Sequence, residues 1–196
     1  MAGCRPLTDE EINLVRNSFT GRFASRNKTF FEVGIRTGYR VSELLSIKVS
    51  DVEQHGVIKD TITVEPRHMK GKRRGRTLVV HAAAKAAIAE HLNDYERKWG
   101  RRMTPEMFLF RSQTGVNRAL SRTQLSKILH DIYDSHKLMG KLGSHALRKS
   151  FAQKMYKAFG RDIVKVQSAL GHSSLNSTAA YLRNFTSQEI DDAILA

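Results

Sequence analysis

Five side chains that can bind phosphate or move protons lie in three short segments of this sequence. Arg40 stands in TGYRVSELL, His145 and Arg148 in GSHALRKSFA, and His172 and Tyr181 in LGHSSLNSTAAYLRN. A guanidinium group grips phosphate oxygens through its planar fork, and a histidine or a tyrosine can take part in proton transfer. The histidine of the Gly-His pair precedes Tyr181 by nine positions, and this spacing needs an explanation.

Each segment taken alone also has a purely structural interpretation. Arg40 could be a surface arginine paired with Glu43, three residues later. A histidine at a helix start, such as His145, is more often a capping or packing residue than a catalyst. Tyr181 alone would be a half-buried helix tyrosine whose hydroxyl is satisfied. No single segment therefore decides the function.

A fourth segment, RHMKGKRRGR at residues 67–76, carries six Lys and Arg residues in ten positions. The simplest interpretation is a solvated loop or a non-specific contact with phosphates, because such a density of charge repels itself without an anionic partner. Two-residue alternation does not distinguish Lys70 from Lys72, since both would face the same way. The cations that we expect to contact phosphates here, besides these lysines, are Arg67, Arg73, Arg74 and Arg76.

The composition agrees with a nucleic-acid partner. The chain has 33 Lys and Arg against 19 Asp and Glu, a formal net charge of +14, and nucleic acid is the commonest partner of so basic a domain. No apolar run approaches the roughly 18 residues of a membrane span, so no membrane association is expected. A single cysteine, Cys4, cannot form an internal disulfide or a cysteine-based zinc cluster, which favours a cytoplasmic location.

The elements that must position these residues are mostly helices. Thr8 and Glu11 form a predicted capping box, and Gly38 is the predicted end of the second helix. The β-branched runs TITV and TLVV flank the basic segment and predict an antiparallel hairpin. Apolar spacing and propensity predict further helices over 82–99, 121–134, 145–158, 162–170 and 176–183, and a last short one capped by Thr186. The predicted fold class is mainly α with a small antiparallel β-sheet (α+β), in one domain.

The order Arg, hairpin Lys, HxLR, Gly-His and Tyr resembles the tyrosine recombinase (phage integrase) family, over essentially the whole chain. TGYRVSELL, SHALRKSFA and LGHSSLNSTAAYL are each similar to the family pattern. The resemblance implies the family's catalytic-domain fold, mostly helical with a three-stranded sheet on one edge. It further implies that residues 1–196 are a single catalytic domain, without the DNA-binding domain that precedes it in most members.

The resemblance implies a reaction and a role for each residue. Tyr181 would attack a DNA phosphodiester and form a 3′-phosphotyrosyl bond, with His145 as base. Three side chains would bind the non-bridging oxygens: Arg40, Arg148 and His172. Lys70, favoured over Lys72 because a Lys-Gly pair is closer to the family pattern, would protonate the leaving oxygen. Glu43 would orient Arg40, and the covalent step would need neither metal nor nucleotide cofactor.

The resemblance also implies double-stranded DNA as partner, with a homo-tetramer on two sites and a monomer without DNA. A site-specific recombinase of the integrase type is the leading hypothesis. A type IB topoisomerase would use the same chemistry without a partner protomer, and a non-catalytic DNA-binding module would keep the fold alone. The target sequence, and whether the event is integration, excision or resolution, stay open.

Overall fold

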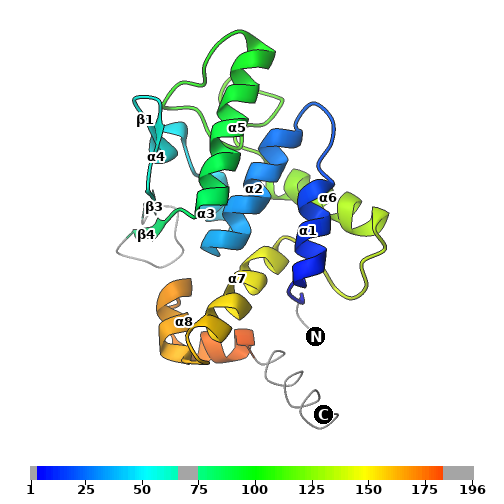
Figure 1. Ribbon diagram of the computed structural model, residues 1–196, viewed down its shortest axis with the longest axis vertical. Helices are drawn as coiled ribbons and strands as arrows, with labels where there is room; N and C mark the ends of the chain where they lie inside the picture. Colours follow the sequence, from blue (N-terminus) through cyan, green and yellow to red (C-terminus); the bar gives the residue numbers. More distant parts are fainter. Residues whose placement is uncertain (1–3, 66–74, 183–196) are drawn as a thin grey trace.

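The computed structural model describes residues 4–65 and 75–182, which form a mainly helical molecule with short strands on one edge (Figure 1). The helices are α1 Asp9–Asn17, α2 Ala24–Thr37, α3 Val41–Leu45, α4 Val49–Val52, α5 Ala82–Trp99, α6 Arg122–Ser135, α7 His145–Ala158 and α8 Ile163–Leu170. The strands are β1 Glu53–Gln54, β2 Val57–Ile58, β3 Thr61–Val64 and β4 Arg76–Val79. Residues 175–182 are also helical. The predicted fold class is confirmed; the helix predicted after Thr186 lies outside the described residues.

Helix α2 forms the centre of the fold. It packs against α5 on one side and α7 on another, and its apolar residues lie in the main core with those of α3, α5 and the 109–110 segment. Phe30 meets Phe110 edge to face, with ring centroids 5.0 Å apart. Because α2 is buried on several sides, its C-terminal end is a fixed reference point for the loops around it.

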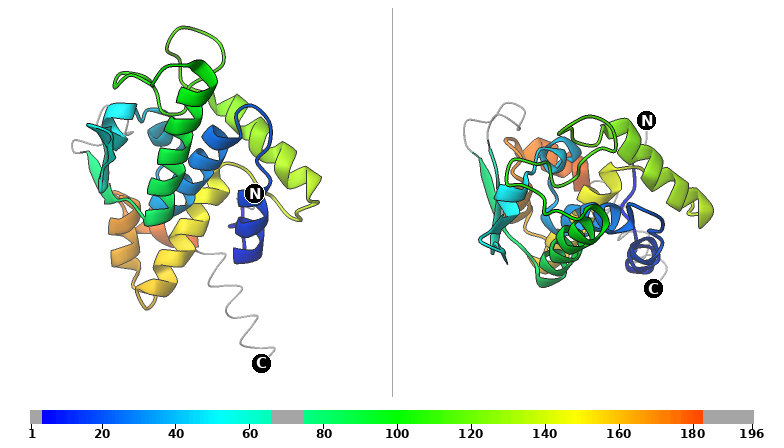
Figure 2. Two further views of the ribbon diagram at one scale, coloured as in Figure 1. Left: turned by 45° about the horizontal axis from the view of Figure 1, so that its top comes forward. Right: turned by 90° about the horizontal axis from the view of Figure 1, so that it is seen from above.

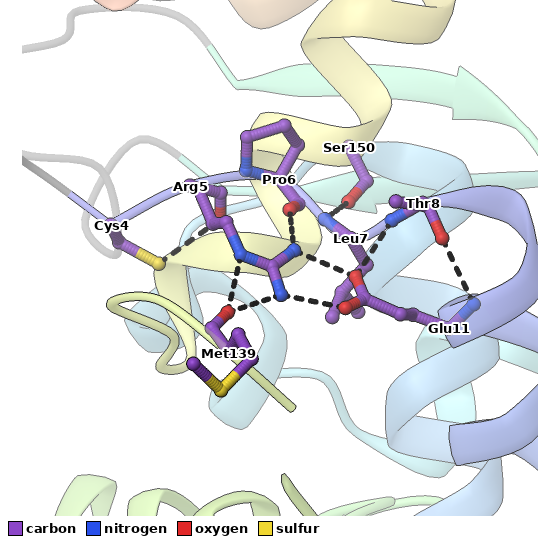
Figure 3. A network of polar contacts seen from close by, with 8 residues as sticks. All are labelled: Cys4, Arg5, Pro6, Leu7, Thr8, Glu11, Met139 and Ser150. Carbon is purple, nitrogen blue, oxygen red and sulfur yellow. Dashed lines mark hydrogen bonds and ion pairs between the residues drawn. The ribbon is translucent and has the colours of Figure 1, made fainter. Parts of the chain in front are cut away.

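The N-terminal segment is tied to both α1 and α7 (Figure 3). The guanidinium of Arg5 donates to both carboxylate oxygens of Glu11, at 2.7 and 2.6 Å, and its Nε donates to the Met139 carbonyl at 2.8 Å. The predicted capping box of Thr8 and Glu11 is present. The backbone N–H of Leu7 donates to Ser150 Oγ at 2.9 Å, so the segment is anchored to α7 close to Arg148.

The strands form two ladders where the resemblance implied one three-stranded sheet. The described strands pair as β1 with β2 and β3 with β4, both antiparallel. The chain leaves strand geometry at Lys59 and Asp60, so the extended run 57–64 pairs first with β1 and then with β4. Both ladders lie at the edge of the molecule away from α6 (Figure 2). The predicted TITV hairpin strand is therefore confirmed, and the single sheet is corrected to two short ladders.

A second, smaller apolar cluster supports the C-terminal part of the described chain. It contains Phe151 and Ala152 of α7, Val166 and Leu170 of α8, and Leu182. This cluster packs the helical segment 175–182 against α7 and α8 independently of the main core. The position of that segment consequently depends on how α8 is held.

Gly38 joins the two clusters at a point where only glycine fits. It ends α2 in the left-handed region, at φ +58°, and a Cβ built on it would lie 2.2 Å from Phe151 Cδ1. A Cβ raises the energy of the left-handed conformation, and the ring of Phe151 occupies the space that a Cβ on residue 38 would need. The turn that precedes Arg40 thus requires glycine for two separate reasons.

We predict that Gly38→Ala lowers the free energy of unfolding by about 3 kcal/mol, the sum of the left-handed cost and of overpacking. Gly100→Ala is the matched control. Gly100 ends α5 at φ +63° with nothing within 4 Å of an added Cβ, so only the conformational cost of about 1 kcal/mol applies. Urea denaturation of both variants measures the difference, and equal losses would contradict the role of Phe151.

Candidate active site

Arg40 stands at the N-cap of α3, two residues after Gly38. Its backbone N–H donates to one carboxylate oxygen of Glu43 and its guanidinium to the other, each at 2.8 Å. The Glu43 side chain is fully buried, whereas that of Arg40 is 33% exposed. The carboxylate therefore fixes the base of the arginine while the rest of the guanidinium stays accessible.

Arg148, on α7, is buried with 4% of its surface exposed. It donates to the carbonyl of Gly38 and, at 2.8 Å, to the carbonyl of Leu170. Burial, together with the charge of Arg40, lowers the pKa of Arg148 to about 10. The group is still protonated at neutral pH, so a full positive charge lies inside the protein at this point.

His145 is the first residue of α7 and lies at the surface. Partial desolvation lowers its pKa below 6.5, and the charges of Arg148 and Lys149 act in the same direction. The imidazole is consequently neutral at pH 7. A neutral imidazole beside two cations can accept a proton, which is the property required of a base.

His172 follows Gly171, the left-handed cap of α8. Its Nδ1 lies 2.9 Å from Thr178 Oγ1, and its carbonyl accepts from the side-chain amide of Gln167 at 3.2 Å. Thr178 has no exposed surface. The histidine is therefore held through its backbone from α8 and through its ring from the segment that carries Tyr181.

Tyr181 packs its ring edge to face on His172, with centroids 5.5 Å apart, and Lys149 Nζ lies 5.4 Å from the same ring. The hydroxyl is buried and makes no hydrogen bond of good geometry with the described residues. Burial raises the pKa of Tyr181 to about 12, although Arg148 and Arg40 act in the opposite direction. The phenol is therefore protonated at neutral pH.

The structure brings the five predicted side chains into one site. Arg40 is close enough to influence the pKa of His145, Arg148 and Tyr181, and His172 contacts Tyr181 directly. The residues come from three separate parts of the chain: the α2–α3 turn, the start of α7 and the stretch after α8. The site forms only because α2, α7 and α8 meet.

The predicted lysine and most of its basic neighbours cannot be placed against this site. Lys70 and Lys72 lie outside the described residues, as do Arg67, Arg73 and Arg74.

Arg76 is described, and the prediction that it contacts DNA is wrong, because its side chain is turned into the protein. It is 8% exposed, its guanidinium lies 4.9 Å from the centroid of the Tyr39 ring, and it donates to the Thr37 carbonyl at 2.9 Å and to the Ala169 carbonyl.

No metal-ligand cluster accompanies these residues in the part of the chain that the structure describes: no three His, Cys, Asp or Glu side chains gather there. Nor is any helix within 4–65 and 75–182 long and apolar enough to cross a membrane.

Comparison with known proteins places this arrangement in a family. The model described as "Phage integrase family" matches residues 6–188. The chain belongs to the phage integrase family. It is 29% identical over 180 residues to tyrosine recombinase XerD of Halalkalibacterium halodurans, covering 90% of this chain and 56% of that protein. It is 31% identical over 171 residues to tyrosine recombinase XerH of Campylobacter jejuni, covering 87% and 44%. The chain thus spans about half the length of the curated relatives it matches.

Solved structures of the family have the same fold. A crystal structure of the XerH site-specific recombinase, bound to palindromic difH substrate as a post-cleavage complex, superposes with a TM-score of 0.72 at 27% identity. It covers 97% of this chain and 52% of that one. The crystal structure of XerA recombinase, at 23% identity, gives a TM-score of 0.70 over 96% of this chain and 66% of that one, which supports the fold. The catalytic-domain fold expected from the motifs is confirmed.

Sequence reasoning missed several residues that hold this phage integrase site together. Thr178 contacts the His172 ring, Lys149 lies over the Tyr181 ring, and Tyr39 donates its hydroxyl to the carbonyls of Ile62 and Arg76. Thr178 carries a weak signal, since it lies three residues before Tyr181 and so on the same helical face. Nothing in the sequence around Tyr39 indicates its partners, because they lie in the hairpin.

We predict that the His145 imidazole titrates below pH 6.5, because partial desolvation and Arg148 both disfavour its protonated form. The sign follows by linkage: the stability that a neutral His145 contributes is complete above about pH 6.5 and is lost as the pH falls below it. Histidine NMR titration measures the midpoint, with the resonance assigned by its disappearance in His145→Gln. A midpoint at or above 6.5 would contradict the lowering of this pKa by desolvation and by Arg148.

Proposed function

We propose that this chain is the catalytic domain of a site-specific DNA recombinase that cleaves and rejoins DNA through a 3′-phosphotyrosyl intermediate, without metal or ATP. The observation that carries the proposal is the position of Tyr181. Its ring packs on His172, and its hydroxyl lies within the influence of Arg148 and Arg40. A nucleophile, two guanidinium groups and a neutral histidine are thereby gathered where one phosphodiester could meet them all.

The arginines and His172 would stabilise the negative charge that develops on the non-bridging oxygens of the phosphate. Attack on a phosphodiester gives a pentacoordinate state with more negative charge on the non-bridging oxygens, and preorganised donors lower the energy of that state. Arg148 uses two of the five guanidinium N–H groups on the carbonyls of Gly38 and Leu170. The others are the ones that we propose bind the phosphate, together with Arg40.

The proton of the attacking Tyr181 hydroxyl would pass to His145. With a pKa near 12, the phenol of Tyr181 is not ionised at neutral pH, so attack requires a base. His145 has a lowered pKa and lies beside the same arginines. The Tyr181 oxygen bonds to phosphorus as its proton leaves for His145, and the bond from phosphorus to the 5′-oxygen breaks.

A lysine of the hairpin would protonate the leaving 5′-oxygen. We propose Lys70 for this role, with Lys72 as the alternative, and assign sequence-independent phosphate contacts to Arg67, Arg73 and Arg74 around them. A 5′-hydroxyl of another strand then attacks the phosphotyrosyl bond, which rejoins the DNA and frees Tyr181. The energy of the phosphodiester is kept in the covalent intermediate, so no nucleotide cofactor is needed.

The proposed partner is double-stranded DNA, bound by a homo-tetramer that joins two sites and dissociates to monomers without DNA. The XerH relative is bound to its difH substrate in solved complexes, and the XerD and XerH relatives are bacterial recombinases, which supports a location with the DNA of the bacterial cytoplasm. Recombination is favoured over the topoisomerase alternative because the relatives are named as recombinases.

We predict that Tyr181→Phe abolishes covalent trapping on a nicked suicide duplex while leaving folding and DNA affinity unchanged. The hydroxyl has no hydrogen-bond partner of good geometry among the described residues, so its removal costs little stability. Denaturing gel electrophoresis measures the adduct, and a filter or mobility assay measures binding.

Tyr156→Phe is the matched control, since it removes a hydroxyl from a partly buried tyrosine of the same apolar cluster and should trap DNA normally. Adducts formed by Tyr181→Phe would show that another tyrosine is the nucleophile. Strand exchange between two labelled duplexes by the unaltered chain tests recombination, and religation without exchange would favour a topoisomerase.

We predict that a substrate with sulfur in the 5′-bridging position rescues Lys70→Ala, because a thiolate leaves without a proton. Arg40→Ala should not be rescued, since its target is a non-bridging oxygen. The measurement is the single-turnover cleavage rate on each substrate. Rescue of Lys72→Ala, with Lys70→Ala close to normal on the unmodified substrate, would move the acid to Lys72.

A further inference from the structure

Two arginines from different elements bind the same pair of helix ends. Arg148 donates to the carbonyls of Gly38 and Leu170, and Arg76 donates to those of Thr37 and Ala169. The four carbonyls are two consecutive ones at the end of α2 and two consecutive ones at the end of α8. We call these two guanidinium groups and four carbonyls the carbonyl clamp.

The clamp pairs backbone carbonyls that would otherwise be left without a hydrogen-bond donor where the C-terminal ends of α2 and α8 come together. The last carbonyls of a helix have no partner within it and carry the negative end of its dipole. Both helices end in a left-handed glycine, Gly38 and Gly171. Two such ends brought together would repel and leave buried acceptors unpaired, whereas a guanidinium placed between them satisfies both.

Arg76 is itself tightly placed for this purpose. Its guanidinium lies over the ring of Tyr39, and the Tyr39 hydroxyl donates to the Arg76 carbonyl at 2.8 Å and to the Ile62 carbonyl at 2.9 Å. Its Nε and one terminal nitrogen are buried without a hydrogen bond, so the aromatic face is what compensates that part of the group. Strand β4 is thereby joined to the turn that precedes Arg40.

We propose that Arg76 is a positioning residue for His172, an inference that rests on the proposed function of the site. The carbonyl that Arg76 binds on α8, at Ala169, lies three residues before His172. Arg148 and the apolar cluster hold α8 against α7. The Arg76 bridge adds a second polar contact between the end of α8 and the end of α2, so His172, and through it Tyr181, keeps its place relative to Arg40.

Arg76→Lys tests this directly: one terminal nitrogen of Arg76 binds both carbonyls, and the shorter lysine side chain cannot place its ammonium there or stack a planar group on Tyr39. The first readout is the NMR signature of the His172 imidazole, assigned by its loss in His172→Ala. We expect the His172 resonances to shift or broaden in Arg76→Lys and to stay unchanged in Arg97→Lys, a control at an exposed ion pair of α5. Unchanged His172 resonances in Arg76→Lys would overturn the proposal.

Two further variants separate the clamp from general damage. Arg76→Gln, which is shorter still and carries no charge, provides the same test if the lysine variant does not fold. Tyr39→Phe keeps the ring under the guanidinium and removes only the hydroxyl bonds to the hairpin. We expect its His172 resonances to match the unaltered chain; a shift as large as that of Arg76→Lys would assign the effect to hairpin anchoring and overturn the proposal.

The second readout is a double-mutant cycle in single-turnover cleavage at saturating DNA. Arg76→Lys should slow adduct formation by about tenfold to a hundredfold, as displaced catalytic groups do, with DNA affinity unchanged. In a His172→Ala background the same substitution should cost almost nothing, because the residue through which it acts is gone. Equal losses in both backgrounds would overturn the proposal. A chain that forms no adduct at all would refute the proposed function, while the NMR comparison would still decide the role of Arg76.

Discussion

The buried guanidinium of Arg148 is the constraint on which the rest of the site depends. A charge that is 4% exposed is costly unless its N–H groups are paired, and here they are paired with backbone carbonyls at the ends of α2 and α8. Those carbonyls exist in the right place only because Gly38 and Gly171 end their helices in the left-handed region. Gly38, Gly171 and Arg148 are thus one structural unit. Arg40 follows Gly38 by two residues, and His172 directly follows Gly171.

The same burial that holds the site together opposes the ionisation of the proposed nucleophile, Tyr181. Removal from water raises the pKa of Tyr181 to about 12, against the pull of Arg148 and Arg40. At about 1.4 kcal/mol per pKa unit, the phenolate of Tyr181 is roughly 3 kcal/mol less favourable than that of a tyrosine in water, before any contribution from a base. His145 is affected in the complementary sense, because partial desolvation and neighbouring cations keep it neutral. A protonated phenol and a neutral imidazole in one site are what the proposed general-base attack requires.

Most of the fold and the five clustered side chains follow from the sequence, for identifiable reasons. The helix over 145–158 and the left-handed end at Gly38 are local features, fixed by periodicity and by a residue type that tolerates positive φ. Arg76 ends a segment rich in basic residues, which predicts a contact with DNA, while the feature that decides its orientation is the ring of Tyr39, 37 residues earlier. The break of the strands at Lys59 and Asp60 also escaped prediction, since ladder pairing depends on long-range contacts.

The balance of charge at the site suits the transition state of the proposed reaction better than its ground state. Arg40, Arg76 and Arg148 surround a single buried carboxylate, Glu43, which acts on all three. Only Arg40 is paired with it directly; the other two donate to carbonyl dipoles, which stabilise a cation without cancelling its charge. Three guanidinium groups and one carboxylate leave a net charge of about +2, whereas a phosphodiester carries −1 and the pentacoordinate state formed by a phenolate approaches −2. Under the proposed function, the excess positive charge would be matched only as the reaction proceeds, and the desolvation of two arginines without an ion-pair partner would be offset at the step where stabilisation raises the rate.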